Sequence, residues 1–151
     1  MCSSDLTKTQ ERPSLALVRK FDAAPAKVWR AITEPEMLKQ WMAPDPATRC
    51  KVAEIDLRVG GRYRIVMSPA EGEDHDVRGA YREIVPNKKL VYTWAWKTTP
   101  ERESLVTIEL RAVGKGTELT LRHEQFADVE ARNRHQHGWT GCLSHLEKAL
   151  A

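Results

Sequence analysis

The chain has 151 residues, of which 41% are hydrophobic and 30% are charged, enough for one globular domain with a continuous core. Its 24 Lys and Arg and 21 Asp and Glu leave a formal charge of +3; the two signs are interspersed and no basic-aromatic motif accompanies them, which argues against nucleic-acid binding. No apolar run approaches the roughly 18 residues of a membrane span, and the amino terminus lacks the apolar centre of a signal peptide, so we expect a cytoplasmic protein.

The first elements are predicted to be one strand and two short helices. A polar segment, residues 1–14, is expected to be flexible, and residues 15–21 (LALVRKF) have the apolar content of a strand. Pro25 suits the first turn of a helix, and Pro35 begins a second helix that Pro44 ends. We therefore expect a helical pair with a bend between its members.

From about residue 53 the hydrophobic period changes to two, which is typical of half-buried strands. Six strand-like runs follow, separated by turn or loop sequences: residues 53–59, 61–68, 76–85, 89–96, 104–112 and 117–124. The short connections predict an antiparallel meander. Alternation places an apolar set of side chains on one face and a polar set, which includes Glu109 and Arg122, on the other.

The last element is predicted to be one long helix over about residues 129–150. Apolar residues recur along it at helical spacing: Trp139, Cys142, Leu143, Leu146 and Leu150. Asp128 is expected to cap its start. It is long enough to lie across the apolar face of the sheet.

This order of elements resembles the helix-grip fold of the START and Bet v 1-like (SRPBCC) superfamily. More narrowly, the chain is similar to the family homologous to the carboxy-terminal domain of the activator of the heat-shock protein 90 ATPase. The similarity is carried by FDAAPAKVWRAITEPEMLKQWM, EIDLRVGGRYRIVM, GAYREIVPNKKLVYTW and GTELTLRHEQF, followed by Gly138 and Trp139. The eukaryotic co-chaperone carries a further amino-terminal domain, so the chain resembles the small stand-alone prokaryotic members.

The resemblance covers about Leu15 to the last residue and implies a single α+β domain over residues 15–151. In that fold a curved antiparallel seven-stranded sheet grips the long helix, with residues 15–21 and 117–124 as neighbouring strands. It also implies a cavity between sheet and helix, which in the wider superfamily binds lipids, sterols and other apolar molecules.

An aromatic stretch, LVYTWAW, places Tyr92, Trp94 and Trp96 on one face of a strand. Together with the resemblance, this alternation predicts a set of residues that line the cavity: Trp41, Tyr63, Met67, Tyr81, Tyr92, Trp94, Trp96, Ile108, Leu121, His123, His135, Trp139 and Cys142. The alternative interpretation is that these side chains fill the core at ordinary density.

The histidines offer the main candidates for chemistry. His123 falls on the inward face near a strand end, where its imidazole can contact a ligand or be satisfied by a backbone carbonyl or water. His135 shares the apolar stripe of the long helix, whereas His137 must point elsewhere, which argues against a paired metal site. His145 is expected to face solvent or a sheet edge.

No metal and no cofactor are expected. The sequence HEQFA, which begins at His123, lacks the second histidine that zinc peptidases need. The glycines that begin at Gly60 and at Gly114 indicate hairpin turns rather than phosphate-binding loops. The three cysteines, Cys2, Cys50 and Cys142, have no metal or redox spacing and read as free thiols.

Three functions remain open. The leading hypothesis is a soluble module that binds an apolar or amphipathic small molecule. The second, suggested by the family name, is an interaction protein that contacts a chaperone and regulates its ATPase. The third is a cavity enzyme of the cyclase or aromatase type, with His123 as acid or base and Glu54, Tyr81 or His135 as helpers. The sequence is compatible with a monomer or a homodimer.

Overall fold

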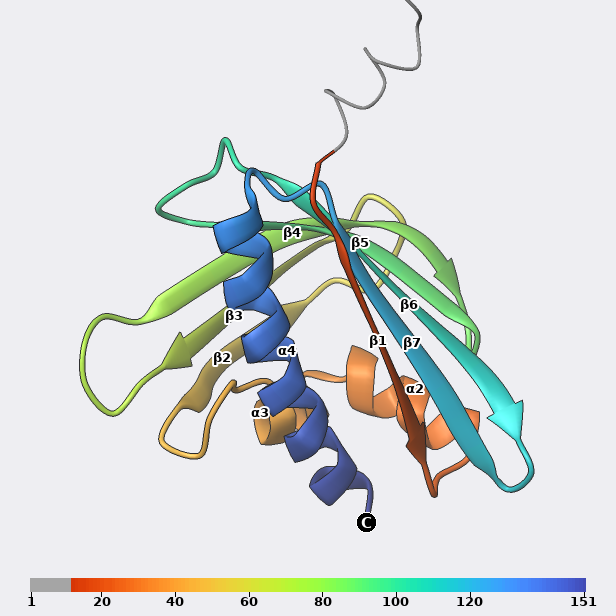
Figure 1. Ribbon diagram of the computed structural model, residues 1–151. Helices are drawn as coiled ribbons and strands as arrows, with labels where there is room; N and C mark the ends of the chain where they lie inside the picture. Colours follow the sequence, from red (N-terminus) through yellow and green to blue (C-terminus); the bar gives the residue numbers. More distant parts are fainter. Residues whose placement is uncertain (1–11) are drawn as a thin grey trace, which may run out of the picture.

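The computed structural model describes residues 12–151, which form seven strands and three helices (Figure 1). Cys2 and most of the segment expected to be flexible, residues 1–14, lie outside these described residues. The strands are β1 (Leu15–Phe21), β2 (Arg49–Ile55), β3 (Arg62–Ser68), β4 (His75–Val85), β5 (Lys89–Trp96), β6 (Ser104–Val113) and β7 (Gly116–Glu124). The helices are α2 (Pro25–Thr33), α3 (Pro35–Trp41) and α4 (Val129–Leu150).

The strands make one antiparallel sheet in the order β1-β7-β6-β5-β4-β3-β2. β1 pairs with β7, with Leu17 opposite Leu121, so the predicted neighbourhood of these two strands is confirmed. The sheet curves around α4, and α2 and α3 lie beside the carboxy-terminal half of that helix (Figure 1). This is the predicted helix-grip arrangement.

Alternation along the strands determines which side chains face α4. The inward positions of β6 and β7 are buried, whereas Glu109, Arg111 and Arg122 on the opposite face are exposed. The buried apolar residues of strands and helices form one cluster that extends from Leu15 to Leu150. The core therefore lies between the concave face of the sheet and the three helices.

Strand β2 differs from the prediction, which placed it at residues 53–59. Alternating apolar residues continue to Val59, but the chain leaves the sheet after Ile55 and turns back, with the Asp56 N–H bonded to the Arg62 carbonyl at 3.0 Å. Gly60 adopts a φ of 84° in this turn, a conformation that glycine favours. Val59 is consequently exposed, so its apolar character is not evidence of a strand here.

Helix α4 begins and packs through specific local contacts. The Ala131 N–H donates to the Asp128 side chain at 2.8 Å, which confirms the predicted cap. Further along, His145 is half-buried and lies 2.8 Å from the Ala43 carbonyl oxygen, to which its ring Nδ1–H donates. The prediction that His145 faces solvent or a sheet edge is wrong, because the connection from α3 to β2 passes beneath α4.

Two glycines of α4, Gly138 and Gly141, face that same connection. Replacing each by alanine is expected to have opposite effects on the free energy of unfolding. A Cβ at Gly141 would overlap the Pro44 carbonyl, whereas a Cβ at Gly138 would meet only the Pro44 side chain at 3.8 Å. We expect Gly141→Ala to lower the free energy of unfolding by about 1–3 kcal/mol through overpacking. Gly138→Ala, the matched control, is expected to raise it by up to about 1 kcal/mol through helix propensity.

Urea unfolding of both variants, followed by circular dichroism, measures this difference. Equal stability of the two alanine variants would show that α4 does not depend on close approach to Pro44.

Candidate ligand cavity

A cavity of about 790 Å³ lies between the sheet and the amino-terminal half of α4. Its wall is formed by the end of β5, the loops that follow β3 and β5, the connection after α3, and α4 itself. The buried part of the wall is largely apolar and aromatic: Met42, Met67, Trp94, Phe126, Trp139 and Cys142. Charged residues surround its exposed part: Asp45, Glu71, Glu73, Lys97, Arg102 and Arg134.

The structure divides the predicted lining residues into two groups. Six of them lie on the wall of this cavity: Met67, Trp94, Trp96, His135, Trp139 and Cys142. The others are not part of that wall and are buried in the core: Trp41, Tyr63, Tyr81, Tyr92, Ile108, Leu121 and His123. The strand residues of both groups face inward as alternation predicts, but those of the second group are covered by other parts of the protein.

The core group is packed and bonded within the protein. Trp41 donates its indole N–H to the Ala31 carbonyl at 2.8 Å. Tyr63, Tyr81 and Tyr92 form an aromatic cluster with ring centroids 5.2–6.0 Å apart. For these residues the alternative interpretation, ordinary core packing, describes the arrangement.

His123 lies at the centre of a chain of buried hydrogen bonds. The Trp139 indole N–H donates to its Nδ1 at 2.9 Å, so the neutral ring carries its proton on Nε2. That Nε2–H donates to the Ser104 hydroxyl at 2.7 Å, and the hydroxyl donates to the Trp94 carbonyl at 3.2 Å. Both ring nitrogens of His123 are therefore occupied by protein groups.

His135 has the opposite tautomer. Its Nδ1–H donates to the Ala131 carbonyl at 2.7 Å, and its Nε2 accepts the Trp96 indole N–H at 2.9 Å. The two imidazoles lie close together, with ring centroids 5.1 Å apart. His135 is on the cavity wall, but its polar atoms are engaged there.

Burial keeps both histidines neutral. It holds the pKa of His123 well below its usual value, and the nearby His135 adds to this shift. Burial also lowers the pKa of His135, with a smaller contribution from Arg134, against the raising effect of its bond to the Ala131 carbonyl. His135 therefore presents an uncharged imidazole to the cavity wall, and the neutral ring of His123 lies behind that wall.

The cysteines are equally unreactive. Cys50 and Cys142 are buried free thiols, and burial raises their pKa to about 11 and about 12, respectively. A protonated thiol is a weak nucleophile, so Cys142 contributes packing rather than chemistry to the wall.

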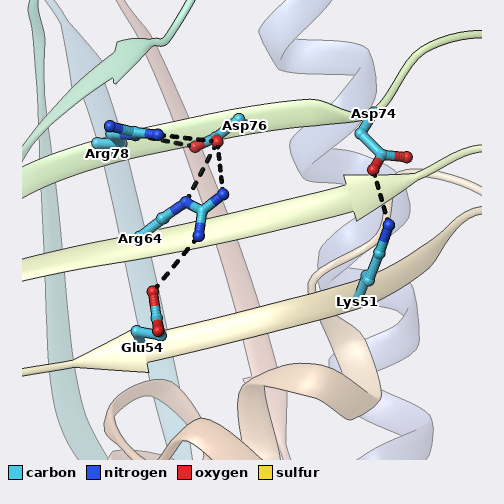
Figure 2. A network of polar contacts seen from close by, with 6 residues as sticks. All are labelled: Lys51, Glu54, Arg64, Asp74, Asp76 and Arg78. Carbon is cyan, nitrogen blue, oxygen red and sulfur yellow. Dashed lines mark hydrogen bonds and ion pairs between the residues drawn. The ribbon is translucent and has the colours of Figure 1, made fainter.

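Glu54 lies on the other side of the sheet, in a surface network of charges (Figure 2). Arg64 on β3 pairs with Glu54 at 3.6 Å and with Asp76 at 3.1 Å, and Arg78 also binds Asp76 at 3.1 Å. Hydrogen bonds from Arg78, then Arg64, lower the pKa of Asp76. The prediction that Glu54 assists chemistry in the cavity is wrong, because its strand position points it outward.

Several residues of the site were not predicted from the sequence. Ser104 begins β6 opposite Trp94, and Met42 and Phe126 lie outside regular elements, where periodicity gives no direction. Within residues 12–151 there is no group of three or more His, Cys, Asp or Glu residues placed to hold a metal ion. No helix of that same range is long and apolar enough to cross a bilayer.

Comparison with known proteins identifies the family. Residues 22–151 match the model of the family described as Activator of Hsp90 ATPase homolog 1-like protein. The chain belongs to this family. A human relative, Activator of 90 kDa heat shock protein ATPase homolog 1, is 28% identical over 142 residues, which are 88% of this chain. Those residues span only 38% of the human protein.

Solved structures support the same assignment to the Activator of Hsp90 ATPase homolog 1-like family. A protein of Chromobacterium violaceum is 29% identical, with a TM-score of 0.83 over 91% of this chain and 96% of its own. The AHSA1 protein of Silicibacter pomeroyi is 28% identical, with a TM-score of 0.80 over 91% of this chain and 97% of its own. The predicted SRPBCC membership and helix-grip fold are confirmed.

Proposed function

We propose that the chain is a binding module for an apolar or amphipathic small molecule that occupies the cavity between the sheet and α4. The observation that carries this proposal is the aromatic wall: Trp94, Trp96 and Trp139 contribute three indole rings to a space of about 790 Å³. Cavities of this size and apolar character are typical of small-molecule sites. The six wall residues predicted from the sequence are the proposed contacts.

The exposed part of the wall suits the polar end of an amphipathic molecule. Glu71 and Glu73 lie on the loop after β3, and Lys97 and Arg102 lie in the connection between β5 and β6. Charged groups at the entrance and aromatic rings inside allow an apolar body to be buried while a polar head stays hydrated.

Binding is favoured over acid–base catalysis by the state of His123. Its side chain is 0% exposed, is not part of the cavity wall, and has both nitrogens bonded to Trp139 and Ser104. A general acid or base must reach the reacting group directly or through one water. This arrangement supports a structural role for His123 over a catalytic one.

The human relative favours a second role, contact with a chaperone. Its name describes an activator of the 90 kDa heat shock protein ATPase, and the similarity covers 38% of that protein. Retention of a purified chaperone of this class on the immobilised chain would support the role. Failure to retain it at low salt, with or without nucleotide, would count against it.

Native mass spectrometry of the freshly purified protein tests the binding proposal directly. We expect an added mass on the folded protein that disappears on denaturation and identifies the bound molecule. The proposal would be contradicted if the purified protein shows only its own mass and also forms no complex after incubation with 1-anilinonaphthalene-8-sulfonate.

Trp96→Ala is expected to weaken binding of that same probe about five- to tenfold, because one aromatic contact surface is lost from the wall. Trp29→Ala is the matched control, since Trp29 is buried on α2 and lies outside the cavity wall. Fluorescence titration at a temperature where both variants are folded gives the two affinities. Equal weakening by both substitutions would mean that lost stability, rather than the cavity, explains the effect.

A further inference from the structure

Helix α4 contributes a glycine to the cavity wall at a position where the fold does not need one. Gly138 lies in the interior of α4, where glycine destabilises a helix relative to alanine. Its backbone is helical, so it does not use the positive φ that glycine permits. Within residues 12–151, a Cβ at Gly138 would meet only the Pro44 side chain, at an ordinary contact distance of 3.8 Å. Both the backbone and the packing of α4 would therefore accept alanine here.

Gly141, about one turn further along α4, has a different reason to be glycine. A Cβ at Gly141 would overlap the Pro44 carbonyl, so close packing against the connection after α3 excludes a side chain there. Gly141 is not part of the cavity wall, whereas Gly138 is half-buried and lies on that wall together with Pro44. Gly138 thus provides open space in the cavity rather than close packing.

This open space lies within the length of the cavity along α4. Four wall residues recur on one face of the helix: Ala131, His135, Gly138 and Cys142. From Ala131 to Cys142 the helix rises about 16 Å, at about 1.5 Å per residue. A volume of about 790 Å³ spread over about 16 Å gives a mean width of about 7 Å. The cavity is therefore longer than it is wide, and Gly138 lies between its ends.

Both ends of this space are apolar. At one end Phe126 packs against His135, with ring centroids 4.9 Å apart, and both nitrogens of His135 are bonded within the protein. At the other end the Cys142 thiol contacts the backbone of Ala43, next to the wall residue Met42. A hydrocarbon needs no hydrogen-bond partner when it is buried, so a hydrocarbon body suits this path.

We propose that Gly138 determines the length of the ligand, because it keeps open a path along α4 for an elongated hydrocarbon body. This inference rests on the proposed function and adds to it the class of ligand, an amphiphile with such a body, and the residue that selects it. An extended chain of about 16 Å contains about twelve carbon atoms. A large side chain at position 138 would divide the path into two shorter parts.

Three alkyl maltosides test this inference, because they share one uncharged head and differ in chain length. Octyl, decyl and dodecyl maltoside are titrated by calorimetry below their critical micelle concentrations. For the wild type we expect the affinity to rise about tenfold with each two added methylene groups, since these groups are buried in the cavity. Gly138→Leu is expected to keep the octyl affinity within about twofold and to reduce each further increase to less than about twofold.

Two further variants control for changes in the helix itself. Thr140→Leu adds the same side chain at an exposed position of α4 outside the cavity wall and is expected to keep the increases of the wild type. Gly138→Ala, which is expected to be at least as stable as the wild type, is expected to reduce each increase to about three- to fivefold. It gives an answer even where Gly138→Leu fails to fold.

The outcomes separate this inference from the proposed function. Increases of the wild-type size in Gly138→Leu, or in Gly138→Ala where the leucine variant does not fold, would overturn the inference while the cavity proposal stands. A wild-type affinity that does not depend on chain length, or an equal loss of the increases in Thr140→Leu, would also overturn it. If the wild type binds neither a maltoside nor 1-anilinonaphthalene-8-sulfonate, the cavity proposal fails and the inference fails with it.

Discussion

Replacing His123 by Ala is expected to lower the free energy of unfolding by about 4 kcal/mol, among the largest effects of any single substitution in this chain. The imidazole is 0% exposed and links Trp139 to Ser104. Its removal leaves a cavity and also leaves the Trp139 indole N–H without its acceptor, a loss that costs more than the net value of a hydrogen bond. Urea unfolding at neutral pH measures the change.

Substitutions that remove one hydrogen bond of His123 at a time provide the controls. Trp139→Phe removes the bond to Nδ1 and Ser104→Ala removes the bond to Nε2. Each is expected to lower the free energy of unfolding by about 1–3 kcal/mol. Because the two contacts share His123, a double-mutant cycle between positions 104 and 139 is expected to show coupling. A His123→Ala variant as stable as the wild type would contradict the structural role and favour the catalytic hypothesis again.

Most of the fold was predictable because each element has a strong local signal. Strand β5 and helix α4 were predicted at the residues where they occur, since β5 is a compact run of apolar and aromatic residues and α4 combines a cap with a long apolar stripe. Strand β2 was misplaced because a register shift between Cys50 and Val52 breaks its alternation. The apolar residues that continue after it belong to a turn.

The site was predicted less completely, because alternation gives the direction of a side chain but not what covers it. Tyr92 and Trp94 lie two residues apart on one face of β5, yet only Trp94 is on the cavity wall. The difference arises from packing: Tyr92 faces the rings of Tyr63 and Tyr81, and Trp94 faces the amino-terminal half of α4. That distinction depends on contacts between distant segments.

The bonding of His123 shows the same limit. Its inward direction followed from its place after Leu119 and Leu121, but its partners come from β6 and α4. From the sequence, the expected partner of a structural histidine here is a backbone carbonyl or water. The observed partners are the side chains of Ser104 and Trp139, 19 and 16 residues away in the sequence.

Acidification is expected to destabilise the protein through His123 and His135, well before its carboxylates are protonated. In the folded state both pKa values are lowered below the ordinary histidine value of 6.5, chiefly by burial. Below about pH 6.5 the unfolded chain therefore binds more protons than the folded chain. As the pH is lowered below about 6.5, the free energy of unfolding decreases, until the folded-state pKa of each histidine is reached.

The expected slope is up to about 1.4 kcal/mol per pH unit for each of the two histidines. Asp76 acts in a different window: its pKa is lowered from 3.8, so its contribution is present above that value and is lost only at more acidic pH. Urea unfolding from about pH 7.5 to about pH 5 isolates the histidine contribution.

Substitutions assign this slope to individual residues. His135→Phe keeps an aromatic ring on the cavity wall, removes one titrating group, and is expected to reduce the slope by the share of His135. His137→Gln, which changes an exposed histidine two residues further along α4, is the matched control. A flat profile for the wild type, or an equal reduction by both substitutions, would mean that the buried imidazoles do not control the stability. A steep profile that His135→Phe reduces would tie the acid sensitivity to the histidine that binds Trp96, and thus to the aromatic wall of the proposed binding cavity.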